Sequence, residues 1–116
     1  ATPTIDWPAC LQRCNQNAEL AHDLLALLAK DLPNLKRAIC KAHRANSNEP
    51  LYQHVHKLHG ACACCGATQL QSQTAHIENI LRNKQQPTTA EINQLINAID
   101  QTQRAIQTET ITASLD

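Results

Sequence analysis

The chain has 116 residues, a length suited to one domain with a modest hydrophobic core. Hydrophobic residues make up 42% of it, but Trp7 and Tyr52 are its only aromatic residues, so the core must consist mainly of Leu, Ile and Ala. This composition, with only two glycines, favours packed helices over turn-rich β architectures. The formal net charge is zero, so no nucleic-acid footprint is indicated.

No apolar run approaches the roughly 18 residues of a membrane span, and no basic leader precedes an apolar core. We therefore expect a cytoplasmic domain without membrane contact of its own, in a parent protein that can be anchored in the inner membrane. The chain begins with Ala1 and contains no Met, which suggests an excised domain. We expect its cysteines to be reduced and mostly buried. They are Cys10, Cys14, Cys40, Cys62, Cys64 and Cys65.

Helix signals in the first half of the chain predict one short and one long helix. Asp6 is suited to cap a short helix with Pro8 in its first turn, ending near Asn15. Residues 17–45 carry the longest helical pattern, and its apolar stripe keeps its phase across Pro33. The stripe consists of Leu20, Leu24, Leu27, Leu28, Leu32, Leu35 and Ile39. Pro33 should therefore kink one near-collinear helix, not separate two helices.

Three further helices are predicted in the second half. The first covers about 48–65, and Gly66 is suited to the left-handed position after it. The second starts at Thr68, and the third is introduced by Thr88 and Glu91, which have the spacing of a capping box.

Because the connections between these segments are short, sequence neighbours should pack antiparallel. The expected fold is all-α, an antiparallel up-down four-helix bundle with a short additional N-terminal helix. One domain spans 1–116, with residues 1–5 and about 112–116 as flexible tails.

The helix over 48–65 carries the residues with the most chemical potential. A helical wheel places four apolar residues within about 60° of each other, facing the core. They are Leu51, Val55, Leu58 and Cys62. His56 then lies about 130° from the centre of that stripe, in solvent, and His59 about 70° from it, on the flank.

Gly60 and Ala63 lie on the same exposed strip as His56, one and two turns further along. A glycine inside a helix costs roughly 1 kcal/mol relative to alanine, and clearance for a bulky partner docking beside His56 would explain it. Lys57 lies on the other side of Gly60, within reach of a group attached to His56. The strip is therefore a candidate docking surface.

Glu78 and Arg82 lie one turn apart on a flank of the following helix. In an antiparallel hairpin around Gly66 they could approach His56, where Arg82 would face an anion and Glu78 would hold Arg82 or an imidazole nitrogen. Neutral imidazole is a good nucleophile, and nearby cations stabilise a phosphoryl group attached to it. The chain has no Gly-rich phosphate loop, Walker lysine or kinase signature, so a partner must supply the phosphoryl donor and any Mg²⁺.

The segment reads His56-x-Leu58-x-Gly60-Ala61-Cys62-x-x-x-Gly66-Ala67. This pattern resembles the signature of histidine phosphotransfer (HPt) domains, and looks most like the C-terminal HPt domain of BarA/GacS-type hybrid sensor kinases. The resemblance implies that His56 accepts a phosphoryl group from a receiver-domain aspartate and passes it to a response-regulator receiver. It also implies a module that is no enzyme in isolation, and we expect it to be a monomer. Most members carry Lys in place of His59, although the BarA/GacS-like group shares the His.

Plainer interpretations are open for each candidate. His56 can be an ordinary surface histidine, Lys57 a solvated lysine, and Glu78 with Arg82 a surface ion pair of little energetic value. His59 is equally compatible with a structural hydrogen bond and with phosphate stabilisation.

Two other classes of function compete with phosphotransfer. One is a structural zinc site made of the clustered histidines and cysteines, and the other is a helical interaction module without chemistry. Zinc is disfavoured because His54, His56 and His59 lack the i, i+4 spacing with which a helix presents metal ligands. A purely structural module would leave the exposed Gly60 unexplained.

Overall fold

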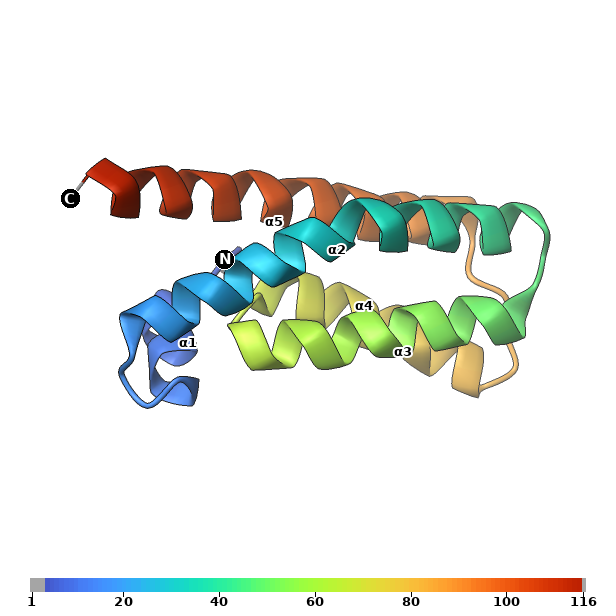
Figure 1. Cartoon of the computed structure of the whole chain (residues 1–116). Coiled ribbons are helices and arrows are strands. Elements are labelled where there is room, and N and C mark those ends of the chain that lie inside the picture. Colours follow the sequence, from blue (N-terminus) through green and yellow to red (C-terminus); the bar gives the residue numbers. More distant parts are fainter. Residues whose placement is uncertain (1–3, 116) are drawn as a thin grey trace.

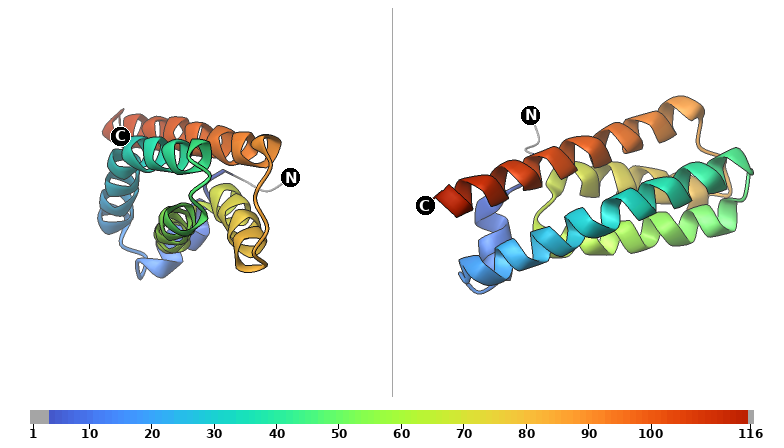
Figure 2. Two further views of the ribbon diagram at one scale, coloured as in Figure 1. Left: turned by 90° about the vertical axis from the view of Figure 1, so that its right-hand side faces the viewer. Right: turned by 45° about the horizontal axis from the view of Figure 1, so that its top comes forward.

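The computed structural model describes residues 4–115, without the side chains of Cys64 and of residues 109–115. Five helices and no strand occur in that range. They are α1 (Trp7–Arg13), α2 (Ala18–Arg44), α3 (Asn48–Cys65), α4 (Thr68–Arg82) and α5 (Thr89–Leu115). The four long helices lie side by side as an antiparallel bundle, and α1 covers the end at which α2 begins and α3 ends (Figures 1 and 2). The predicted fold class is therefore confirmed.

The short helix α1 is fixed to the turn between α3 and α4. The side chain of Asp6 accepts a hydrogen bond from the backbone N–H of Ala9, which caps α1 as the sequence predicts. The backbone N–H of Asp6 donates to the carbonyl oxygen of Gly66 at 2.8 Å. Gly66 has a φ of 70°, the left-handed conformation expected after α3. Gly66 thus ends α3 and also accepts a hydrogen bond from Asp6, the residue that caps α1.

The predicted core stripe of α2 is correct from Leu28 onward and wrong at Leu20 and Leu27. The buried residues of α2 are Ala21, Leu25, Leu28, Leu32, Leu35, Ile39 and Ala42. Leu20 and Leu27, which were expected in the core, are 43% and 59% exposed. Leucines occur on several faces of this part of the helix, so their number alone does not define the buried face. Ala21 and Leu25 face the bundle, and Leu24 packs partly against it.

Pro33 lies inside α2, which remains a single helix across it, as predicted. The ribbon of α2 changes direction along its length (Figure 1). Because proline has no N–H, the carbonyl oxygen of Ala29 loses its intrahelical donor. The side chain of Gln103 on α5 donates to that oxygen instead, with Nε2 at 3.3 Å. A side chain of α5 therefore replaces the backbone hydrogen bond that α2 loses at Pro33.

The start of α5 is a capping box, as the sequence predicts. The N–H of Thr88 donates to Oε1 of Glu91 at 2.9 Å, and the N–H of Glu91 donates to the Thr88 hydroxyl at 3.1 Å. The bond from the Thr88 N–H, with a smaller contribution from His76, holds the pKa of Glu91 below its ordinary value.

The two segments expected to be flexible tails lie at the ends of the described range, and their flexibility stays a prediction. Ile5 packs against the core and the Thr4 hydroxyl bonds to Gln69, while residues 1–3 lie outside the described residues. The backbone of α5 continues as helix past position 112 to Leu115, and residue 116 lies outside the described range. No helix within the described range has the length and apolarity needed to cross a membrane.

Candidate functional site

The face of α3 opposite the core carries the candidate site. The four residues predicted to face inward, Leu51, Val55, Leu58 and Cys62, are all buried. The side chain of His56 is 62% exposed. Gly60, one turn further along, is exposed, and a Cβ built on it would meet no atom of the described residues within 4 Å. The helical wheel therefore gave the right orientation for α3.

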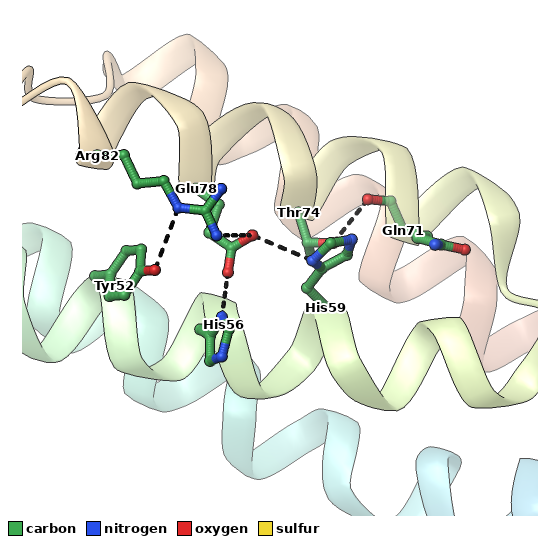
Figure 3. Close-up of polar contacts among 7 residues, drawn as sticks. All are labelled: Tyr52, His56, His59, Gln71, Thr74, Glu78 and Arg82. Atoms are coloured by element: carbon green, nitrogen blue, oxygen red, sulfur yellow. Dashed lines mark hydrogen bonds and ion pairs between the residues drawn. The ribbon is translucent and has the colours of Figure 1, made fainter.

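A buried carboxylate from α4 joins the two histidines of this face. The side chain of Glu78 is 2% exposed. Nδ1 of His56 donates to its Oε1 at 2.5 Å, and Nδ1 of His59 lies 3.1 Å from its Oε2 (Figure 3). The sequence placed Glu78 on a flank near His56, but it gave no sign that the carboxylate would be buried or shared.

The contact with Glu78 determines which ring nitrogen of His56 carries the proton and which carries a lone pair. A carboxylate only accepts hydrogen bonds, so the proton of the neutral imidazole is on Nδ1. The lone pair is then on Nε2, which has no hydrogen-bond partner among the described residues. An exposed side chain with a fixed proton and a free lone pair is arranged as a nucleophile.

Arg82 lies at the edge of the same cluster. Its Nη2 is 3.7 Å from Oε2 of Glu78, and its Nε donates to the hydroxyl oxygen of Tyr52 at 3.3 Å. The hydrogen bond to Tyr52 and the charge of Glu78 raise the pKa of Arg82, so this exposed side chain stays cationic.

Tyr52 is a site residue that the sequence analysis missed. Its ring stacks on the His56 imidazole with centroids 5.7 Å apart and planes inclined by 14°. Its position one turn before His56 was the available signal, because residues at i and i+4 share a helix face.

Lys57 and Ala63 are less closely connected to the cluster. Lys57 is exposed and forms no ion pair with the described part of the chain, and Ala63 is half-buried. The structure thus brings together His56, His59, Glu78 and Arg82, with Gly60 beside them.

The metal centre considered as an alternative depends on how the histidines and cysteines are arranged in space. Within the described residues no group of three or more His, Cys, Asp or Glu side chains could hold a metal ion. Four cysteines, Cys10, Cys14, Cys62 and Cys65, are buried. Burial, with a smaller contribution from Cys65, raises the pKa of Cys62 from 9.0 to about 12, and burial also raises that of Cys10 to about 11. Burial thus favours the protonated form of both thiols.

The structure is thus an antiparallel helical bundle that presents an exposed histidine, paired with a buried carboxylate, on α3. The Hpt domain family model matches residues 8–105, and the chain belongs to that family. This match confirms the resemblance seen in the sequence. Hpt domains are phosphotransfer modules of two-component phosphorelays.

Two relatives similar to this chain are histidine kinases. The chain is 34% identical over 95 residues to sensor histidine kinase GacS of Pseudomonas protegens. It is 28% identical over 103 residues to signal transduction histidine-protein kinase BarA of Shigella flexneri. These matches cover 82% and 87% of this chain but only 10% and 11% of the relatives.

A solved structure agrees with the fold over nearly the whole chain. The crystal structure of the HPT domain from the Hpt sensor hybrid histidine kinase from Shewanella superposes with a TM-score of 0.88 at 27% identity. The match covers 94% of this chain and 95% of that one.

Proposed function

We propose that this chain is the histidine phosphotransfer module of a multistep phosphorelay, in which His56 carries the phosphoryl group. His56 accepts the group from an aspartate of one receiver domain and passes it to the receiver of a response regulator. The observation that carries this proposal is the pairing of His56 with Glu78. The 2.5 Å contact holds the proton on Nδ1, while the exposed side chain offers Nε2 to a partner.

The transfer step follows from that pairing. The Nε2 lone pair attacks the phosphorus of the aspartyl phosphate, a P–N bond forms, and the P–O bond to the aspartate breaks. The aspartate leaves as a carboxylate, and the His56 ring becomes an imidazolium that keeps its Nδ1 proton. The carboxylate of Glu78 lies against that proton and offsets the new positive charge. The reverse sequence, with a second receiver as acceptor, delivers the group onward.

The neighbours of His56 have supporting roles in this proposal. The open space at Gly60 and the strip toward Ala63 let a receiver domain approach Nε2. Lys57 and Arg82 are the cations that would face the phosphoryl oxygens. His59 shares the buried carboxylate with His56. The receiver supplies the Mg²⁺, and the chain needs no cofactor of its own.

The relatives suggest the setting of the module. We place it as a monomeric cytoplasmic domain of a GacS- or BarA-like hybrid kinase, which supplies the ATP-dependent chemistry that this domain lacks. Its partners are then the receiver of that kinase and the receiver of a response regulator.

Phosphoryl acceptance by the isolated domain tests the proposal. The domain is incubated with a receiver carrying a radiolabelled aspartyl phosphate, and acid-labile, base-stable label is counted. His56→Gln should abolish labelling and keep the helical circular dichroism spectrum. His76→Gln is a matched control, because His76 is 54% exposed and also pairs with a carboxylate, Glu91, at 3.0 Å. Label that persists on His56→Gln would refute the assignment.

The docking role of Gly60 is tested separately. Gly60→Leu should block transfer from the receiver, since a bulky side chain would fill the open space above His56. The same variant should still accept a phosphoryl group from phosphoramidate, a small donor that needs no docking surface. Normal transfer from the receiver would exclude this surface as the docking site.

A further inference from the structure

Tyr52 closes a ring of contacts around the proposed site (Figure 3). Its aromatic ring stacks on the His56 imidazole, and its hydroxyl accepts a hydrogen bond from Arg82. Arg82 is paired with Glu78, and Glu78 accepts the hydrogen bond from His56. Each of the four residues thus contacts the next, with two of them on α3 and two on α4.

The stack restricts a motion that the hydrogen bond to Glu78 leaves free. That bond fixes one atom of the imidazole, Nδ1, but the ring can still tilt about the bond. A tilt would swing Nε2 away from the line along which it must attack phosphorus. The ring of Tyr52, inclined by only 14° to the imidazole, opposes the tilt.

The hydroxyl of Tyr52 acts on a second group. Arg82 is exposed, and a long exposed side chain loses conformational freedom when it binds an anion. The hydrogen bond from its Nε to Tyr52, 3.3 Å long, removes part of that freedom before the phosphoryl group arrives. A guanidinium has five N–H donors, so Arg82 can still donate to a phosphoryl group while Nε bonds to Tyr52 and Nη2 lies beside Glu78.

Packing alone does not account for Tyr52. The core on this turn of α3 is made by Leu51 and Val55, which are buried, whereas Tyr52 is only half-buried. Its ring stack on His56 and its hydrogen bond from Arg82 both involve members of the proposed site.

We infer that Tyr52 is a positioning residue of the phosphotransfer site, whose ring orients His56 and whose hydroxyl holds Arg82 beside the phosphoryl group. The inference rests on the proposed function of His56. It adds that a tyrosine one turn before the nucleophile determines how well the site is organised before a partner binds.

The experiment measures the rate of phosphoryl acceptance from two donors, phosphoramidate and a phosphorylated receiver domain. Tyr52→Phe keeps the stack and loses the hydroxyl, and Tyr52→Leu loses both. Tyr52→Phe should lower the rate of phosphoryl acceptance from both donors by about 3- to 10-fold, the effect expected from one net hydrogen bond. Tyr52→Leu should lower both rates further. Gln101→Ala is the control, since it removes an exposed hydrogen bond to Gln69 away from the site and should leave both rates unchanged.

A double-mutant cycle separates positioning from general destabilisation. If the hydroxyl acts through Arg82, then Tyr52→Phe combined with Arg82→Gln should be no slower than Arg82→Gln alone. Additive losses would overturn the role of the hydroxyl. The ¹⁵N NMR signals of the His56 ring should broaden or shift in Tyr52→Leu, and an unchanged ring environment would overturn the role of the stack.

The choice of donors separates this inference from the proposed function. Wild-type protein that accepts no phosphoryl group on His56 would refute both. Wild-type acceptance with undiminished rates in both Tyr52 variants would refute only the role of Tyr52. A loss seen with the receiver but not with phosphoramidate would make Tyr52 a docking contact and overturn its positioning role.

Discussion

Gly60 and Gly66 are close in sequence but have opposite surroundings. A Cβ at Gly60 would meet no atom within 4 Å, whereas a Cβ at Gly66 would lie 2.9 Å from the carbonyl oxygen of Asp6. Gly66 also has a φ of 70°, which side-chain-bearing residues adopt only at a cost. The fold therefore requires glycine at 66, whereas no contact among the described residues requires it at 60.

This contrast predicts opposite effects of one substitution on stability. Gly60→Ala should raise the free energy of unfolding by about 0.5–1 kcal/mol, because alanine is the better helix former. Gly66→Ala should lower it by at least about 1 kcal/mol, from the left-handed backbone and the contact with Asp6. Urea unfolding monitored by circular dichroism measures both. Destabilisation by Gly60→Ala would mean that α3 itself needs the glycine.

Glu78 should be the residue whose loss affects His56 most. Glu78→Ala removes the acceptor for Nδ1, so the proton is no longer fixed there, and phosphoryl acceptance should fall by about 10- to 100-fold, the value of a charge-assisted hydrogen bond. Glu78→Gln keeps an acceptor oxygen without the charge and should lose less. Acceptance from phosphoramidate measures the difference. Equal rates for all three proteins would show that the carboxylate only fills space.

The buried cysteines should be protected from alkylation. At pH 8 a thiol with a pKa of about 12, as for Cys62, has roughly 1,000-fold less thiolate than a thiol with a pKa of 9.0. Burial further limits the access of a reagent to Cys62. Iodoacetamide should therefore label the half-buried Cys40 well before Cys10 or Cys62 in native protein. Peptide mass spectrometry, with urea-unfolded protein as the control, gives the order. Labelling of Cys62 as fast as Cys40 would contradict the burial.

The contact between Gln103 and Ala29 should depend on Pro33. Gln103→Ala leaves the Ala29 carbonyl without its donor and should cost about 1 kcal/mol of stability. In a Pro33→Ala background the helix regains its own N–H, so the same substitution should cost little. Urea unfolding of the four proteins completes the cycle. An equal cost in both backgrounds would show that the glutamine does not compensate for the proline.

Local signals predicted the helix boundaries well. The cap at Asp6, the left-handed Gly66 and the box of Thr88 with Glu91 all depend on neighbours in sequence. The orientation of His56 was predictable for the same reason, because the apolar stripe of α3 has one clear face.

Tertiary contacts were harder to predict. The leucines of α2 occupy several faces, so the choice of Leu25 over Leu20 depends on how the other helices pack. The burial of Glu78 and the contact between Tyr52 and Arg82 depend on how α3 and α4 face each other. The spacing of residues along the chain does not indicate which side chains of α3 and α4 come into contact.

The division of the site between two helices has a consequence for unfolded and misfolded chains. His56 is on α3, while the carboxylate that prepares it is on α4. The pair of His56 and Glu78 therefore forms only when the hairpin of α3 and α4 has closed, and an extended chain presents an ordinary imidazole. Under the proposed function, phosphoryl acceptance by His56 would then require the native packing of these two helices, and unfolded molecules would take no part in the transfer.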